Sequence, residues 1–177
     1  SVVQIEEDLY EGNVSDLWSI GTTPNGGYTM ALAAKAISES LEHKDPLIVT
    51  ANYLNRVNFG KIDIKVETLP STRSLSSARA TMIQDNEIKV IFTATFTDLS
   101  KSTGLNKAFK EEPIFEKYED CHLHAFKEGF NPGLEKFIEK KYCSDSIWWK
   151  ADYKIENKKA VLNLYMYWPN KEKADLY

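Results

Sequence analysis

The sequence has few of the residues that mark a secreted or membrane protein. It contains two cysteines, Cys121 and Cys143, in 177 residues, too few for a disulfide framework or a paired zinc motif. No run of about 18 apolar residues occurs, and the N-terminus lacks the basic-then-apolar order of a secretory signal. We therefore expect no membrane span, a cytoplasmic location and two free thiols.

Arginine is scarce as well. Only Arg56, Arg73 and Arg79 occur, and 22 lysines and arginines against 26 acidic residues leave a formal net charge of −4. A nucleic-acid-binding surface needs clustered positive charge, so we expect no nucleic-acid partner. The 42% of hydrophobic residues is enough for a packed core.

The most apolar segment follows directly on a glycine pair. Gly26 and Gly27 precede residues 28–41, which are rich in alanine, leucine, isoleucine and methionine, with polar residues gathered near the end. This pattern predicts a helix over 28–41 that is enclosed on most sides. The residue before Pro46 disfavours helix, so we expect the helix to end before it.

Strand-like segments follow without another helix, at 47–54, 62–67, 74–84 and 88–96, and a further strand is expected within 9–18. Alternating apolar and charged residues predict that 62–67 has one buried face, and Asp85-Asn86 predicts a tight hairpin turn. An antiparallel sheet covers a helix that is apolar on most sides by curling around it. We therefore predict an α+β protein with the hot-dog fold.

The rest of the chain is charged and interrupted by proline and glycine. Within it we expect a helical turn at 113–120, strands at 134–142, 146–149 and 159–168, and the start of a helix at 171–177. The expected domains are an N-terminal hot-dog domain at 1–105, a connector at 106–133, and the beginning of a second, incomplete hot-dog domain at 134–177.

Several motifs between residues 9 and 100 occur in a fixed order. They are Trp18, Asn25-Gly26-Gly27-Tyr28, the segment 45–57, Arg73-Ser74-Leu75-Ser76, residues 80–84 and the segment 94–99. In this order they resemble the double hot-dog acyl-CoA thioesterases of the thioesterase II (TesB-like) family and their thioesterase-like relatives. The resemblance implies hydrolysis of a fatty acyl or related thioester by an activated water, with an acyl-CoA or other acyl thioester as substrate and no cofactor or metal.

The resemblance also implies where the catalytic carboxylate lies. In the family the hydrolytic Asp is on the helix of the second unit, which begins here near Ala174. We therefore expect the catalytic Asp beyond residue 177 and no catalytic residue within the chain. An open second sheet would expose Val161, Leu164, Met166 and Trp168, so we expect a longer protein or a partner chain that completes the sheet. Hot-dog sheets also have a free edge, and we expect a homo-oligomer.

The candidate substrate-binding residues are Asn25, Gly26, Gly27, Tyr28, Arg73 and Gln84. The first amides of a helix are unpaired and carry partial positive charge, and glycine has no side chain to keep a thioester oxygen away from them. A tight entry turn explains the glycines equally well, and Asn25 is a favoured N-cap residue.

The other two candidates also have alternatives. Arg73, beside Ser74 and Ser76, suits a phosphate, or simply begins a solvated strand. Gln84 is similar in position to the family's catalytic Gln, or is a polar strand residue that faces water.

Two further functions stay open. The place on the first helix that corresponds to the hydrolytic Asp falls near Ala34 and Lys35, which favours a catalytically inactive acyl-thioester binding or assembly protein. A hot-dog dehydratase or hydratase needs an Asp and His pair at the helix, and residues 24–41 contain no His.

The second half offers weaker candidates. His122 and His124 share one strand face beside Cys121, but a metal needs two further ligands, so we expect no metal site. The aromatic residues Trp148, Trp149, Tyr165, Tyr167 and Trp168 are expected to form a packing surface, with an acyl-chain wall as the alternative.

Overall fold

The computed structural model describes residues 2–105, 107–111, 113–150 and 162–167. The chain divides into two compact units, Ser1–Gly104 and Leu105–Ala174, which are described separately below. Among the described residues, every helix is too short or too polar to cross a membrane.

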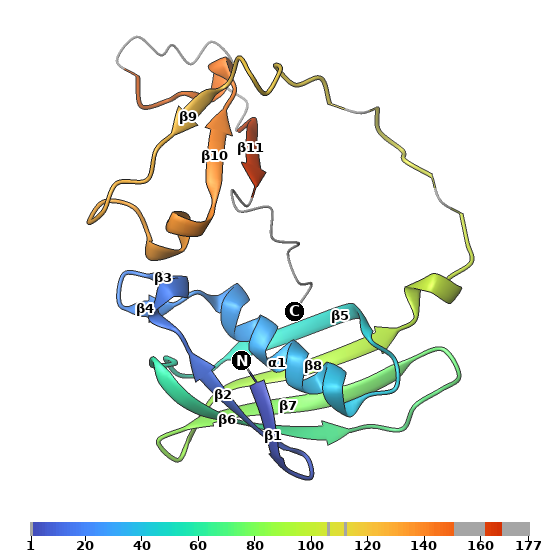
Figure 1. Cartoon of the computed structure of the whole chain (residues 1–177). Helices are drawn as coiled ribbons and strands as arrows, with labels where there is room; N and C mark the ends of the chain where they lie inside the picture. The colour runs from blue at the N-terminus through green and yellow to red at the C-terminus, as the bar shows by residue number, and fades with distance from the viewer. Residues whose placement is uncertain (1, 106, 112, 151–161, 168–177) are drawn as a thin grey trace. The chain divides into compact units, whose positions relative to one another are not determined.

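The first unit is an antiparallel sheet with one helix against it (Figure 1). The strands are β1 (Val2–Glu6), β2 (Leu9–Val14), β5 (Asp45–Tyr53), β6 (Gly60–Thr68), β7 (Ser76–Gln84) and β8 (Glu87–Thr97). They pair in the order β1-β2-β6-β7-β8-β5, and α1 (Gly26–Ser40) packs on this sheet. This is the predicted α+β hot-dog fold.

The core forms between α1 and the three central strands. The helix buries Leu32, Ala33, Ala34, Ala36 and Ile37. The sheet supplies the buried faces of β6, β7 and β8: Ile62, Ile64, Val66, Ala78, Ala80, Met82, Val90, Phe92, Ala94 and Phe96. Small alanines on both the helix and β7 let the two surfaces approach closely, and each large apolar side chain buried here contributes about 1.5–3 kcal/mol.

The predicted elements of this unit are confirmed with shifted ends. The helix begins at Gly26, two residues earlier than predicted, so the glycines form its first turn. The Asp85-Asn86 turn is confirmed, with positive φ at both residues, the conformation of a two-residue hairpin. The strand expected within 9–18 ends at Val14, and a 3-10 helix, η1 (Asp16–Trp18), follows it.

Two features at the edges of this unit were not predicted. Four of the five residues of β1 are exposed, so its sequence has no alternating pattern that predicts a strand. Main-chain pairing with β2 holds β1 in the sheet. The short pair β3 (Ser19–Ile20) and β4 (Thr23–Pro24) leads from η1 into α1.

The second unit contains a small antiparallel sheet of β9 (His122–His124), β10 (Glu139–Tyr142) and β11 (Leu164–Tyr167), in the order β11-β10-β9. The strand predicted at 159–168 is confirmed from Leu164 to Tyr167, while Leu162 and Asn163 precede the strand and the other positions lie outside the described residues. Of the strand predicted at 134–142, the first half is a 3-10 helix, η3 (Gly133–Phe137), and only β10 is extended. The helix start predicted at 171–177 lies outside the described residues.

Two predictions for this unit are wrong. The segment 113–120 forms only a turn that ends at Asp120, where the Asp120 amide donates to the Lys117 carbonyl. The Glu116 carbonyl accepts from the Tyr165 hydroxyl, a contact with a distant residue. The strand predicted at 146–149 is replaced by a 3-10 helix, η4 (Ser144–Ser146), and a turn. There the Ser146 hydroxyl accepts from the Asn163 amide at 2.9 Å, a side-chain bond of the kind that competes with sheet pairing.

Candidate functional site at the start of helix α1

A hollow of about 300 Å³ lies beside the first turn of α1. It is lined by Thr23, Pro24, Gly26, Thr29, Tyr53, Leu54, Asn55, Arg56 and Val57. These residues come from β4, the start of α1, the end of β5 and the segment that follows β5. Among the described residues that line it there is no carboxylate, imidazole or thiol.

Asn25 is the N-cap residue of α1. Its backbone is extended, and its side-chain oxygen accepts from the Tyr28 amide at 3.2 Å. Its carbonyl accepts from the Thr29 amide, and its own amide donates to the Trp18 carbonyl at 2.8 Å. Asn25 therefore fixes where the helix begins and in which direction its first amides point.

The peptide group that joins Gly26 to Gly27 has a hydrogen-bonded carbonyl and an exposed N–H. The Gly26 carbonyl accepts from the Tyr53 hydroxyl at 2.6 Å and from the Thr29 hydroxyl at 2.8 Å. Gly27 is exposed, and no acceptor for its amide occurs in the part of the chain that the structure describes. The open amide carries the partial positive charge of a helix N-terminus.

Both glycines are constrained by their neighbours. A Cβ atom at Gly26 would lie 3.1 Å from the Tyr53 hydroxyl oxygen and 3.3 Å from the ring carbon that bears it. A Cβ atom at Gly27 would lie 3.1 Å from the side-chain oxygen of Asn25. A side chain at Gly26 would therefore crowd Tyr53, whereas a side chain at Gly27 would crowd the Asn25 oxygen that caps the helix.

Tyr28 ties the end of β2 to the helix. Its hydroxyl accepts from the Ser15 amide at 3.0 Å and donates to the Asn13 carbonyl at 3.2 Å. Its ring stacks on Trp18, with centroids 6.2 Å apart. Asn25, Gly26, Gly27 and Tyr28 are therefore brought together in one polar frame around the start of α1.

Arg56 and Tyr53 are functional candidates that the sequence analysis did not single out. The Arg56 guanidinium donates to the carbonyl and to the hydroxyl of Thr22, the latter at 2.9 Å, and so links the segment after β5 to the loop before α1. Both residues lie within the motif 45–57 and Arg56 is one of three arginines, a signal that could have found it. The positive charge of Arg56 and the partial positive charge at the helix N-terminus both favour a negatively charged group in the hollow.

Gln84 lies at the end of β7 and supports the loop beside the hollow. Its side chain is 8% exposed. Its oxygen accepts from the Asn58 amide at 2.8 Å, and its nitrogen donates to the carbonyls of Asn58 and Lys61 at 3.2 and 2.9 Å. It does not face water, and its amide holds the segment that follows Arg56 and Val57.

Replacing Gln84 by alanine is expected to lower the free energy of unfolding by about 1–3 kcal/mol, because the three hydrogen bonds that its buried side chain makes with main-chain groups of Asn58 and Lys61 are lost. A urea titration followed by circular dichroism measures the change. The matched control is Gln4→Ala, at an exposed glutamine of β1, which should stay within about 0.5 kcal/mol of the parent. Equal losses in the two variants would contradict the role given to Gln84.

Arg73 does not lie with the other candidates. It is exposed in the segment between β6 and β7, at the opposite end of these strands from Gly60 and Gln84. Each strand has nine residues, which separates the two ends by about 30 Å. The structure therefore does not bring Arg73 to the hollow.

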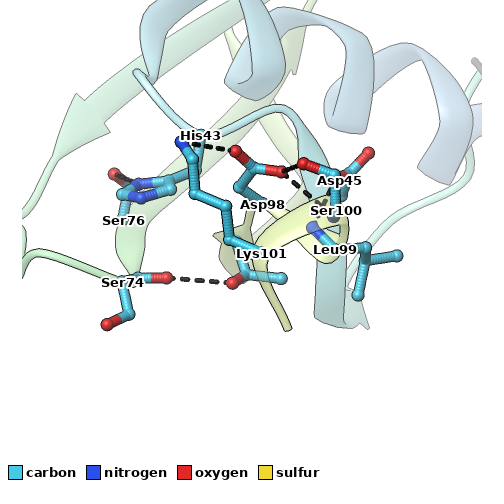
Figure 2. Close-up of polar contacts among 9 residues, drawn as sticks. His43, Asp45, Ser74, Ser76, Asp98, Leu99, Ser100 and Lys101 are labelled. Carbon is cyan, nitrogen blue, oxygen red and sulfur yellow. Dashed lines mark hydrogen bonds and ion pairs between the residues drawn. The ribbon is translucent and has the colours of Figure 1, made fainter. Parts of the chain in front are cut away.

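The residues near Arg73 form a second polar cluster, shown in Figure 2. His43 contacts the hydroxyl of buried Ser76 through Nδ1 at 2.6 Å, and the Thr97 hydroxyl donates to the Ser74 carbonyl. Asp45 accepts from the Leu99 amide at 2.7 Å. His43 follows the C-terminal end of α1, so this cluster supplies no His to the hollow at the opposite end of the helix.

Asp98 caps the 3-10 helix η2 (Leu99–Lys101) in this cluster. The ion pair with Lys101 at 2.7 Å and the hydrogen bonds from Ser100 lower the pKa of Asp98 from 3.8 to about 2. Because the folded pKa lies below the unfolded one, the charged cap stabilises the fold above about pH 3.8, and this contribution is lost as the pH falls through about 2.

Asp98→Asn keeps an oxygen that can accept from the Ser100 amide but removes the charge. We expect the variant to be less stable than the parent at pH 6 and the difference to shrink as the pH is lowered toward 2. Urea midpoints measured between pH 2 and 6 test this, with Lys101→Met as a second variant that removes the partner. A difference that stays constant over this range would contradict the assignment.

The candidates in the second unit are held by packing contacts. His122 and His124 are half-buried on one side of β9 while Leu123 is exposed, as the alternation predicts. The aromatic residues form two clusters: Trp148 and Trp149 with Tyr142 and His124, and Tyr165 and Tyr167 with Tyr118. Trp168 lies outside the described residues.

Potential metal ligands converge at one place among the described residues. Glu116, Cys121 and Cys143 have ligand atoms within 4.8 Å of one another, and neither histidine joins them. Both cysteines are free and buried.

The comparisons with known proteins agree with this architecture. Residues 14–97 match the family model of the acyl-CoA thioesterase N-terminal domain. The chain is 31% identical over 84 residues to the thioesterase-like protein TwmA of Talaromyces wortmannii, a match that covers 46% of this chain and 24% of that protein.

Solved structures share the fold over most of the chain. A protein of Thermobifida fusca YX described as a thioesterase II has a TM-score of 0.74 at 19% identity, covering 82% of this chain and 55% of its own. A hot-dog protein of Alicyclobacillus acidocaldarius has a TM-score of 0.69 at 21% identity, covering 82% and 54%. The tesB protein of Mycobacterium avium subsp. paratuberculosis has a TM-score of 0.56 at 16% identity, covering 80% and 56%.

At these identities the structural likeness shows the fold alone. The chain spans about half the length of these solved structures and about a quarter of the curated relative. The helix with its capped glycine turn and the sheet from β5 to β8 lie within the matched residues 14–97. This part of the chain has the hot-dog fold and is similar to the acyl-CoA thioesterase N-terminal domain.

Proposed function

We propose that this chain belongs to an acyl-CoA thioesterase-like enzyme that hydrolyses a fatty acyl or related thioester with an activated water. The observation that carries the proposal is the exposed Gly27 amide at the start of α1, next to Gly26, which lines a hollow in a domain similar to this family. The related protein TwmA is named thioesterase-like, which supports the same reaction.

The reaction needs donors for the oxygen that becomes negative when water attacks the thioester carbonyl. The amide of Gly27 is such a donor, and the carbonyl of the preceding residue is held by Tyr53 and Thr29, which fixes the orientation of the peptide. Hydrogen bonds to that carbonyl also polarise the peptide, which strengthens its N–H as a donor. Arg56 adds positive charge at the edge of the hollow.

The reaction also needs a general base. The hollow has none among its described lining residues, and α1 carries Ala34 and Lys35 where the family's Asp would stand. Lys35 is paired with Glu39 at 2.8 Å on the exposed side of the helix. We therefore propose that the catalytic Asp belongs to a second hot-dog unit, beyond residue 177, of which residues 134–177 are the beginning and 106–133 the connector.

Substrate binding is proposed for the start of α1, with Gly26 and Gly27 approached by the thioester and with Asn25, Tyr28 and Gln84 holding their frame. Arg73 lies at the other end of the strands and is proposed only for a long ligand that reaches it. The edge strand β5 has exposed apolar residues such as Leu47 and Ile48, which supports assembly with another hot-dog unit or chain.

The test uses the full-length protein and a panel of acyl-CoAs from short to long chain, with release of free CoA measured by a thiol reagent. Saturable turnover of at least one chain length is expected. The lack of a base in the hollow favours a second candidate, a catalytically inactive acyl-thioester binding protein. Acyl-CoA binding by calorimetry without any turnover would select it, and the absence of both turnover and binding would overturn both proposals.

A further inference from the structure

Two thiols meet in the second unit. The sulfur atoms of Cys121 and Cys143 lie 3.6 Å apart, and the residues are 7% and 3% exposed. Cys121 directly precedes β9 and Cys143 directly follows β10, strands that run side by side in Figure 1. Both residues are free.

The strand register explains why these sulfurs meet. In the β9–β10 ladder Tyr142 pairs with His122, so the next pair outward is Cys143 with Cys121. Directly opposite residues of antiparallel strands have Cα atoms about 4.5–5.5 Å apart, within the range that a disulfide bridges, about 4.4–6.8 Å. Joining the sulfurs therefore requires side-chain rotation and little movement of the backbone.

The neighbouring carboxylate does not make this pair a closed metal site. Glu116 accepts from the amide and the hydroxyl of Ser144, at 2.6 and 2.9 Å, and so is occupied at the start of η4. A structural zinc site needs four ligands, whereas three ligand atoms converge in the described part of the chain. The geometry fits a dithiol better than a metal site.

We propose that Cys121 and Cys143 are a redox modification site and form a reversible intramolecular disulfide when a hydroperoxide oxidises the protein. One thiolate attacks the peroxide, its sulfur is oxidised to a sulfenic acid, and hydroxide or alkoxide leaves. The second thiol attacks that sulfur, the S–S bond forms, and water leaves with the second proton. In total, two thiols and one hydroperoxide give one disulfide, one water molecule and either a second water molecule or an alcohol.

The surroundings slow the oxidation of the pair. Burial and the neighbouring Cys143 raise the pKa of the Cys121 thiol to about 11; Glu116 adds to this effect and Lys141 opposes it. Little Cys121 thiolate therefore exists at neutral pH, and burial of both residues restricts access by large disulfides. A small hydroperoxide fits this site better than a bulky oxidant.

The experiment treats the chain with hydrogen peroxide in the presence of dimedone, which traps sulfenic acids, and measures intact mass and remaining thiols. Loss of both thiols together, with a mass lower by two hydrogen atoms, is expected. No dimedone adduct should form, because the second thiol reacts first, and dithiothreitol should restore both thiols. The same treatment in urea should give the adduct, since unfolding separates the pair.

The control variants are Cys121→Ser and Cys143→Ser, each of which should give the dimedone adduct and no loss of two hydrogens. A parent protein that gains oxygen atoms on either cysteine, forms disulfide-linked dimers or gives the adduct while folded would overturn the proposal. Stoichiometric zinc in the purified chain that protects both thiols would overturn it as well. The parent measurement decides the matter even if a serine variant fails to fold, and it does not depend on thioesterase activity.

Discussion

Replacing Phe92 by alanine is expected to lower the free energy of unfolding of the first unit by about 3–5 kcal/mol. Phe92 is fully buried on β8, where it faces the core beneath α1. Its cross-strand neighbours are Ala80 on β7 and Ala51 on β5. Because both are alanines, neither can fill the space that the phenyl ring would leave, and the cavity stays open.

Hydrogen exchange of the β7 and β8 amides in increasing urea measures this loss in the first unit alone. The matched control is Ile88→Ala, on the same strand with a side chain that is 44% exposed, and it should cost less than about 1 kcal/mol. Similar losses at the two positions would show that the ring is not packed as the structure describes.

Gly27→Val is expected to lower the kcat of the thioester hydrolysis proposed above about 100-fold. The valine side chain would stand in front of the open Gly27 amide and press on the Asn25 side-chain oxygen, 3.1 Å from the new Cβ. The developing oxyanion would lose this donor, while the folded state keeps its core. Gly27→Ala, with a smaller side chain, should fall between the parent and the valine variant.

The control places the same side chain, a valine, one helical turn further along the same face. Ala31→Val, at a half-buried position, should leave kcat within about threefold of the parent. Thermal unfolding of each variant separates loss of the site from loss of the fold. An unchanged kcat for Gly27→Val in an active enzyme would leave the glycine only its role in the entry turn.

The sequence predicted the first unit well because its patterns are local. The alternation of Ile62, Ile64 and Val66 with charged residues predicts a strand with one buried face, and each of the three is buried. The apolar run after Gly27 predicts an enclosed helix, and a two-residue turn of aspartate and asparagine fits a hairpin. These signals depend on periods of 2 and 3.6 residues, which burial against one core imposes.

The second unit was predicted less well because its short elements depend on individual side-chain contacts. Ser146 bonds Asn163, and Tyr165 bonds the Glu116 carbonyl, across separations that no local pattern reveals. Aromatic residues that look like one patch in the sequence divide between two clusters. Propensity is a weak guide where such contacts set the backbone.

The candidate site shows the same division. The glycine pair and its Asn cap were predicted from adjacent residues, since capping is a local interaction. Tyr53 and Arg56 reach the helix start from β5 and its following segment, 27 and 34 residues from their partners Gly26 and Thr22. Their role could be recognised only from the folded path of the chain.

The amino-acid order alone thus determined that a sheet wraps one enclosed helix, because the spacing of apolar residues and the turn residues are both contained within short segments. Tertiary structure alone decided that Arg73 lies far from the hollow, that Gln84 holds a loop, and that Cys121 meets Cys143. Strand register and pairing order set these relations, and they follow from the free energy of the packed core as a whole, which no single segment contains.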